Sequence, residues 1–345
     1  MPSTWQPRFV ATAIGSLPHT EPQAACDLVR RYLPQVPVWP QLPKRTFQES
    51  MYVQYSHGFP GVVIDTERIY VDRSRDLTTE LEQLYQRYLE NDLESAAMPP
   101  EYGAGLAHFL QLDFSGAEAV KGQVIGPISW GLSVTDQNRR AVLYDEVLAE
   151  AISKHLRLQA AWQERALRRL APRTIIFLDE PYMASFGSAY VALTREQVVT
   201  LLEEVLGGLE GLKGIHCCGN TDWSVLLSTS VDIISLDAYG YADTLALYPD
   251  AVHAFLQRGG MIAWGIVPTG SDAVIKAETP ESLVARLEAA VEGLAARGIE
   301  RETLVAASLV TPACGMGSTM SETGAAQALA LLAEVSERLR QKYCR

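Results

Sequence analysis

The segment "KGIHCCGNTDW" at residues 213–223 places a histidine and two adjacent cysteines directly after a short apolar run. Successive side chains of a strand point to opposite faces, so His216 and Cys218 would share one face and Cys217 would occupy the other. That spacing suits two ligands that converge on one metal ion, and it does not suit a Cys217–Cys218 redox pair. The spacing alone leaves open that the cysteines are ordinary core residues and that the histidine is a buried, hydrogen-bonded one.

Two further candidate ligands follow later apolar runs, namely Asp237 in "ISLDA" and Cys314 in "TPACG". A tetrahedral zinc site takes four N, S or O ligands, or three ligands and an open position. We therefore predict a metal centre made of His216, Cys218 and Cys314, with Asp237 as a weaker fourth member. Thiolate ligands favour Zn²⁺ over magnesium or calcium.

Polar residues also end several of the other apolar runs: Ser16, Ser129, Asp179 and Glu180. Core strands do not need such groups, and burying them without partners would be costly. Ser16 could instead simply end a strand, and the Asp179–Glu180 pair could cap the next segment or pair with arginines. We expect at least one of these two carboxylates to be functional.

Short apolar segments, each followed by a helical pattern, recur along the whole chain. Near-continuous apolar strands that alternate with helices indicate a parallel sheet covered by helices. Eight such units without a linker predict an α/β fold, a single (β/α)8 TIM barrel over residues 1–345, with active-site groups at the carboxyl ends of its strands. A doubly wound open sheet is the alternative, but no G-x-G-x-x-G follows the first segment. The expected strands lie at 9–17, 36–42, 119–130, 174–180, 212–218, 231–239, 261–268 and 304–310.

The segment 57–118 does not follow this alternation, and we interpret it as an insertion near the barrel mouth. "GVVIDTERIYVD" is typical of a β-hairpin, and "DLTTELEQLYQRYLEND" of a helix outside the repeat.

Composition narrows the classes of function. The 345 residues are 48% hydrophobic and 20% charged, and the formal charge is 29 − 41 = −12. An acidic chain argues against a nucleic-acid partner or an anionic membrane surface, both of which attract basic patches. The start of the sequence shows no basic leader before an apolar run, so we expect a cytoplasmic protein. Five cysteines without framework spacing then favour metal binding or catalysis over disulfides.

Five segments, in chain order, resemble the C-terminal catalytic barrel of cobalamin-independent methionine synthase. They are "AIGSLPHT", "FLDEP", "IHCCGNTDW", "DIISLDA" and "TPACGMGS", and together they span nearly the whole chain. The chain is also similar to the zinc methyltransferases that demethylate methylated corrinoid proteins. Those enzymes share an H-x-C-G-N-type motif and a barrel like that of uroporphyrinogen decarboxylase.

The resemblance implies a set of roles. Zinc would be held by His216, Cys218, Asp237 and Cys314; the family usually has glutamate in place of Asp237, whose shorter side chain leaves open whether it ligates directly or through water. Ser16 would contact the carboxylate of homocysteine, and Asp179 its amino group. The predicted catalytic residues are thus Asp179, His216 and Cys218, and the predicted substrate-binding residues are Ser16, Asp179 and Glu180.

The sequence also departs from that family. The synthase's second, N-terminal barrel has no counterpart in this sequence. The stretch "DEPYMASFG" lacks the acid that serves the folate, and no Y-G-S-R segment is present. These departures favour a methylcorrinoid donor, either a corrinoid protein or methylcobalamin, over methyltetrahydrofolate.

The sequence therefore predicts a zinc-dependent methyltransferase that converts homocysteine, or a similar small thiol, to its S-methyl product, as in methionine biosynthesis. A uroporphyrinogen-decarboxylase-like enzyme is one alternative; it needs no metal, and its arginine-rich N-terminal motif is not evident. A non-catalytic zinc- or thiol-binding protein is the other. A purely structural zinc site would use four protein ligands and would need no amino-acid-binding groups.

Overall fold

The computed structural model describes residues 5–65 and 68–344 and shows an α/β fold built on a curled parallel sheet. Every pairing between neighbouring strands of this sheet is parallel. In sheet order the strands are β1 (Val10–Ala11), β10 (Ser308–Pro312), β9 (Met261–Val267), β8 (Ile233–Leu236), β7 (Leu212–Cys217), β6 (Thr174–Asp179) and β4 (Val120–Ile125).

The segment 36–42 joins the two edges of this sheet. Val38 forms a parallel bridge with Lys121 of β4, and Gln41 forms one with Ser16, just beyond β1. The segment thus occupies the place of the second strand of a (β/α)8 ring. It contains two prolines, which have no N–H to donate, so it forms isolated bridges rather than a continuous ladder. The predicted barrel is confirmed, with seven regular strands and one irregular member.

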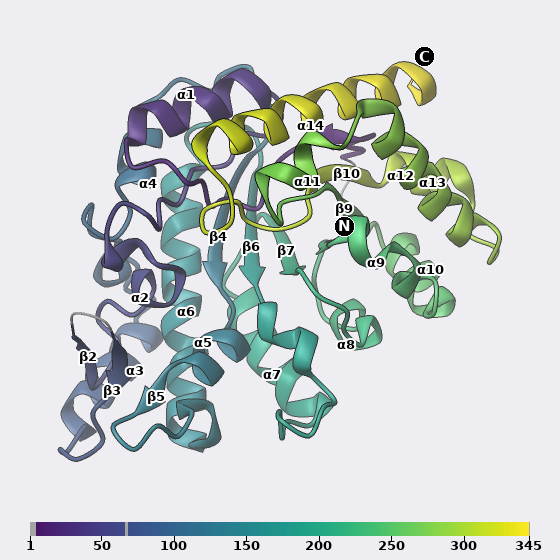
Figure 1. Cartoon of the computed structure of the whole chain (residues 1–345). Helices are drawn as coiled ribbons and strands as arrows, with labels where there is room; N and C mark the ends of the chain where they lie inside the picture. The colour runs from purple at the N-terminus through teal and green to yellow at the C-terminus, as the bar shows by residue number, and fades with distance from the viewer. Residues whose placement is uncertain (1–4, 66–67, 345) are drawn as a thin grey trace.

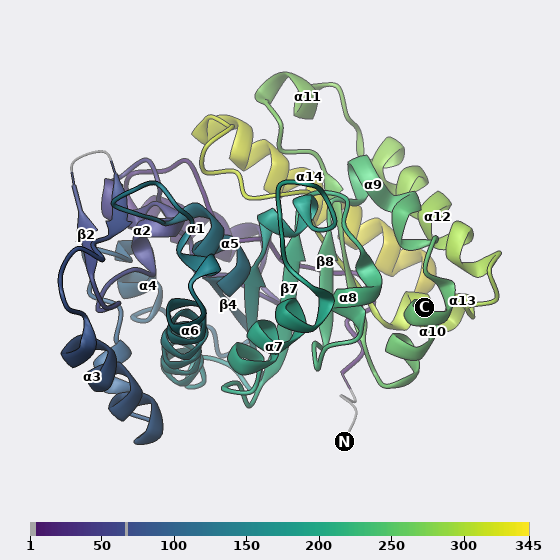
Figure 2. The same cartoon turned by 90° about the horizontal axis from the view of Figure 1, so that it is seen from below.

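Helices lie outside the strands (Figures 1 and 2). The larger hydrophobic core lies between them and the sheet. In the part of the chain that the structure describes, no helix has the length and hydropathy needed to cross a bilayer. The helices are α1 (Pro22–Tyr32), α2 (Met51–Gln54), α3 (Thr78–Leu89), α4 (Ala104–Phe109), α5 (Pro127–Ser133), α6 (Glu146–Leu167), α7 (Arg195–Leu206), α8 (Trp223–Leu227), α9 (Ala238–Leu245), α10 (Pro249–Gln257), α11 (Asp272–Lys276), α12 (Pro280–Ala295), α13 (Arg301–Ala306) and α14 (Glu322–Tyr343).

A second, smaller apolar cluster fills the inside of the barrel. It joins inward-facing residues of β1, β6, β8, β9 and β10, and each member is almost fully buried. Alternation along each strand puts one set of side chains into this cluster and the other set against the helices. The members are Trp5, Val10, Val36, Ala119, Ile175, Phe177, Ile233, Met261, Ala263 and Leu309.

The predicted insertion is present beside the barrel (Figure 1). Strands β2 (Val62–Ile64) and β3 (Ile69–Val71) form the expected antiparallel hairpin, although residues 66–67 within it lie outside the described residues. Helix α3 is the expected helix and packs on α6. β3 pairs with β5 (Thr135–Asp136), which follows α5 and so comes after the carboxyl end of β4. The insertion is therefore attached on the side of the barrel where strands end.

Several predicted boundaries were wrong; the strand expected at 119–130, for example, ends at Ile125, because α5 begins at Pro127. Helix α6 begins at Glu146, where the Asp145 carboxylate accepts the N–H of Leu148 and caps the helix. The last strand, expected from Leu304, begins at Ser308, because α13 takes up the preceding residues.

His155 of α6 connects the start of the insertion to the barrel wall. Its Nε2 lies 2.9 Å from the carbonyl oxygen of Tyr55, and its ring meets Phe59 edge-on at 5.5 Å between centroids. The pKa of His155 is lowered to about 4, mainly by burial. The hydrogen bond to the Tyr55 carbonyl opposes this shift, and His57 and Arg87 contribute to it.

We expect His155 to make the fold sensitive to acid. The unfolded chain takes up a proton on this residue below about pH 6.5, whereas the folded chain does so only near pH 4, so stability is lost as the pH falls between these values. When the pH is lowered from 7.5 to 5, the free energy of unfolding measured in urea should fall by about 2 kcal/mol more for the wild type than for His155→Gln. Equal losses in the two proteins would contradict this assignment.

Candidate metal centre and its surroundings

Three of the predicted ligands meet at the carboxyl ends of the strands. His216 lies at the end of β7, Cys218 directly follows that strand, and Cys314 lies in the loop after β10. The candidate ligand atoms of these three residues all lie within 4.8 Å of one another. Ligand atoms of a tetrahedral zinc site are about 3.3–3.8 Å apart, given bonds of about 2.0–2.3 Å, so a small contraction would enclose the ion.

The histidine ring is oriented for ligation. Its Nδ1 lies 3.0 Å from the hydroxyl oxygen of Ser235, which is its partner in the register of β7 and β8. Its Nε2 is buried and has no hydrogen-bond partner. A metal-bound histidine characteristically has one ring nitrogen held by a second group and the other free for the ion. The residues present therefore fit a zinc ion.

The two cysteines share one negative charge. A hydrogen bond from Cys314 lowers the pKa of the Cys218 thiol to about 4, and His216 adds to this effect, against the opposing effect of burial. The same hydrogen bond, together with burial, raises the pKa of Cys314 above its ordinary value. A thiolate is the form in which cysteine binds metal, so the lowered pKa of Cys218 favours ligation.

Cys217 is separate from this group. It is fully buried in the core between strands and helices, and its thiol donates to the carbonyl oxygen of Gly219 at 3.5 Å. Burial raises its pKa to about 12. The strand alternation predicted this separation from the sequence.

Asp237 lies at the end of β8, outside the group of three. Its Oδ1 accepts the backbone N–H of Gly240 at 2.8 Å, so the side chain caps α9. Burial raises its pKa, Cys218 raises it further, and His216 lowers it, so the carboxyl group interacts electrostatically with both proposed ligands. One carboxylate oxygen is used by the cap, and ligation by Asp237 stays a prediction.

Asp179 ends β6 and pairs in register with His216 on the neighbouring strand. The side chain is buried, and its Oδ1 has no hydrogen-bond partner. Burial raises the pKa of Asp179 to about 6, Lys121 and His216 oppose this shift, and Cys218 reinforces it. A buried carboxylate oxygen without a partner can accept a hydrogen bond from a ligand.

The side chain of Glu180 is bound to the start of α5. Its two oxygens accept the N–H groups of Ile128 and Ser129 at 2.9 and 2.8 Å, and the hydroxyl of Ser129 at 2.6 Å, so it caps the start of α5. Burial raises its pKa to about 7. Both oxygens are thus engaged by the protein, and the substrate contact predicted for Glu180 stays a prediction that would require these bonds to change.

Ser16 lies against the loop that carries Cys314. Its hydroxyl oxygen accepts the N–H of Gly317 at 3.2 Å, and its carbonyl oxygen accepts the N–H of Met316 at 3.0 Å. A Cβ at Gly315 would come within 2.2 Å of the Ser16 hydroxyl, so the close approach of the two loops needs glycine there. The structure thus brings the first and last predicted site segments together.

Sequence reasoning missed two residues of these surroundings. Ser235, which orients His216, has no signal of its own in the sequence, because a serine in an apolar strand is unremarkable. Lys121 had a signal: it is a charged residue within the apolar stretch "AVKGQVIGP". It lies fully buried inside the barrel, where burial lowers its pKa to about 7 and the charge of Asp179 opposes the shift.

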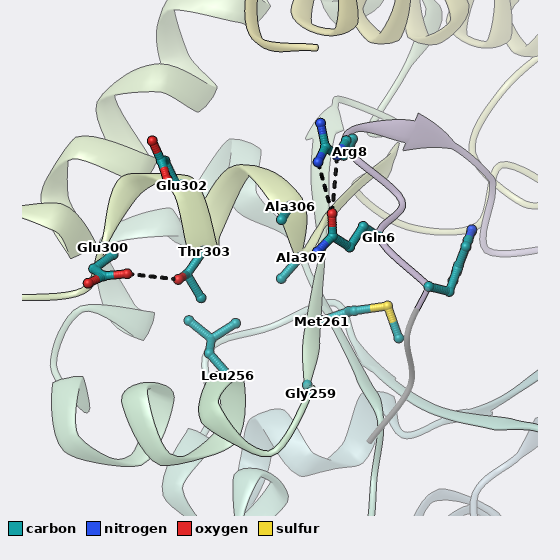
Figure 3. A pocket seen from close by; sticks show the side chains of 12 residues that line it. Gln6, Arg8, Leu256, Gly259, Met261, Glu300, Glu302, Thr303, Ala306 and Ala307 are labelled. Atoms are coloured by element: carbon teal, nitrogen blue, oxygen red, sulfur yellow. Dashed lines mark hydrogen bonds between the residues drawn. The ribbon is translucent and has the colours of Figure 1, made fainter. Parts of the chain in front are cut away.

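A cavity of about 380 Å³ lies at the opposite end of the barrel, where strands begin (Figure 3). Met261 and Ala307, at the starts of β9 and β10, are among its lining residues. The guanidinium of Arg8 is paired there with the side chain of Gln6, and Thr303 with Glu300. None of the predicted site residues lines this cavity.

No family model matches this chain, and no curated protein matches it. Among solved structures, it resembles a B12-independent methionine synthase from Shewanella sp. W3-18-1 in complex with selenomethionine, at 20% sequence identity and a TM-score of 0.46. The similarity covers 65% of this chain and 63% of that one, so the chain spans less than two thirds of that protein's length. A likeness of this size carries no argument about function.

Metal analysis tests the centre directly. Zinc should remain bound to the wild type at about one ion per chain after dialysis, and Cys218→Ser and Cys314→Ser should each lose most of it, because serine does not supply a thiolate. Cys217→Ser is the matched control, since it changes the same chemical group one residue away, and it should keep its zinc. Full zinc in the first two variants would contradict the proposed ligands.

Proposed function

We propose that this protein is a zinc-dependent methyltransferase that methylates a small thiol, with homocysteine as the best candidate. The observation that carries the proposal is the convergence of His216, Cys218 and Cys314 at the carboxyl end of the barrel, within 4.8 Å of one another. Catalytic zinc sites commonly use three protein ligands and leave a position open for substrate. Zinc bound there would stabilise a coordinated thiol as its thiolate, the nucleophilic form, at neutral pH.

The chain's own residues would bind and orient the rest of the substrate. Asp179 offers a buried carboxylate oxygen without a partner beside His216, suited to an ammonium group. Ser16 lies on the other side, against the Cys314 loop, where its hydroxyl could donate to a carboxylate while its oxygen keeps the Gly317 contact. An amino acid with a thiol side chain has all three groups that such a site would recognise.

The methyl donor we propose is a methylcorrinoid. The support is in the sequence, where the segments that serve the folate in the resembled family are missing. The aromatic side chains of Tyr52 and Tyr182 lie on the mouth side, and both Tyr182 and Cys218 raise the pKa of Tyr52, after the larger effect of burial.

Two other functions fit less well. A uroporphyrinogen-decarboxylase-like reaction would give the cysteine pair and the free Nε2 of His216 no role. A structural zinc module would close the site with four protein ligands and would leave the unpartnered oxygen of Asp179 unexplained.

A methyl-transfer assay with homocysteine tests the function and the donor together. The zinc-loaded protein should form methionine with methylcobalamin and form it much more slowly with methyltetrahydrofolate. Comparable rates with both donors would contradict the donor assignment. No product from either donor would reject homocysteine as acceptor.

Asp179→Asn should weaken binding of an amino-acid thiol without loss of zinc. Removing a charge-assisted hydrogen bond of this kind costs about 1.5–3 kcal/mol, so KM for homocysteine should rise roughly 10- to 100-fold. Asp250→Asn, at an exposed site of α10, makes the same chemical change away from the barrel mouth and should behave as the wild type. An unchanged KM in Asp179→Asn would remove this residue from the substrate site.

A further inference from the structure

Lys121 is a buried cation inside the barrel that the proposed reaction does not yet use. Its side chain is fully inaccessible to solvent, and its Nζ lies 4.3 Å from the centre of the Phe177 ring, within the apolar cluster of the barrel interior. Within residues 5–65 and 68–344, no carboxylate lies within ion-pair distance, 4.0 Å, of this ammonium.

The fold by itself gives no reason for a charge at this position. Burying an ammonium without a direct counter-ion is costly, and an apolar side chain of similar volume would commonly fill the same space at no loss of stability. Phe177 beneath it and the surrounding apolar residues would accept such a replacement. A buried charge kept in this setting indicates a role outside packing.

The contacts of Lys121 point to the segment that carries Ser16. Its Nζ donates to the carbonyl oxygen of Ile14 at 2.7 Å and to the side-chain oxygen of Gln123 at 3.3 Å. The Gln123 amide in turn packs on Gly15, where a Cβ would come within 2.5 Å of it and where φ is +147°. Lys121 thus holds the backbone at Ile14, two residues before Ser16, through this hydrogen bond.

The charge of Lys121 also acts on the other proposed substrate group. Asp179 and Lys121 lie on the neighbouring strands β6 and β4, and each changes the ionisation of the other. The ammonium therefore contacts the segment that carries Ser16 and also interacts electrostatically with Asp179. In a water-poor interior, such a charge acts more strongly than it would in solvent.

We propose that Lys121 is a specificity-determining, positioning residue: its buried amino group, which a bound carboxylate favours in the charged ammonium form, makes the site select a ligand that carries a carboxylate. The inference rests on the proposed function in one respect, namely that the acceptor is an amino acid. Lys121 touches neither the ligand nor the metal in this account. It holds the Ile14–Ser16 segment and sets the sign of the potential where the ligand's carboxylate binds.

Three ligands without sulfur test this role independently of zinc and of methyl transfer. L-Norleucine carries both charged groups, hexanoate has the carboxylate alone, and pentylamine has the ammonium alone, all on the same carbon chain. Binding to the full-length protein is measured by titration calorimetry. Lys121→Met should weaken L-norleucine and hexanoate at least 10-fold and should leave pentylamine unchanged or bind it more tightly.

The difference between the effect on the two carboxylate ligands and the effect on pentylamine separates a change of charge from a change of packing. A variant that merely distorted the site would weaken all three ligands, and that result would overturn the proposal. Lys121→Gln retains a donor for the Ile14 carbonyl without the charge, so it should show the same selectivity change. Lys213→Met removes one positive charge from β7 and leaves the barrel interior untouched, so it should match the wild type. Wild-type selectivity in Lys121→Gln would also overturn the proposal.

A measurement on the wild type decides the matter if neither variant folds. In protein labelled with ¹⁵N-lysine, the buried ammonium signal should shift on saturation with hexanoate and stay in place with pentylamine. No shift with hexanoate would contradict the proposal. Failure of the methyl-transfer assay together with the predicted ligand selectivity would reject the proposed reaction alone and leave the role of Lys121 standing.

Discussion

Parallel pairing around the barrel is the constraint on which the candidate site depends. Strands β6, β7, β8 and β10 run in one direction, so four residues that are spread over a long stretch of sequence lie at one rim: Asp179, His216, Asp237 and Cys314. Direct parallel pairing of β1 with β10 brings Ser16 beside the Cys314 loop, and residues 36–42 close the ring between β1 and β4.

The distribution of apolar and polar groups inside the barrel follows from the same arrangement. The inward positions form an apolar cluster at one end, and polar groups without full partners lie toward the other: the Nε2 of His216, the Oδ1 of Asp179, and the hydroxyls of Thr12 and Thr311. Buried polar groups are normally hydrogen-bonded, so a set of unpartnered atoms at one rim is unusual for a core and ordinary for a binding site. The cysteine pair, with one thiolate held by the other thiol, belongs to the same pattern.

The sequence allowed the barrel, the insertion and the convergence of His216, Cys218 and Cys314 to be predicted, because each depends on a periodic or strand-end signal. Alternation along β7 separated Cys217 from its neighbours correctly. The irregular second strand was not predictable from apolar pattern alone, since its prolines prevent a continuous ladder while its position still closes the ring. The caps formed by Asp145 and Asp237 were missed, and the cap formed by Glu180 was only one of two alternatives, because a carboxylate at a strand end can face a helix terminus or a ligand. Only the fold decides which.

Zinc K-edge X-ray absorption on the zinc-loaded protein, before and after addition of homocysteine, tests the central claim most directly. The account predicts two sulfur ligands and one or two nitrogen or oxygen ligands at first, and a third sulfur at about 2.3 Å once homocysteine is present. A zinc shell that holds fewer than two sulfurs, or one that does not gain a sulfur from homocysteine, would contradict it.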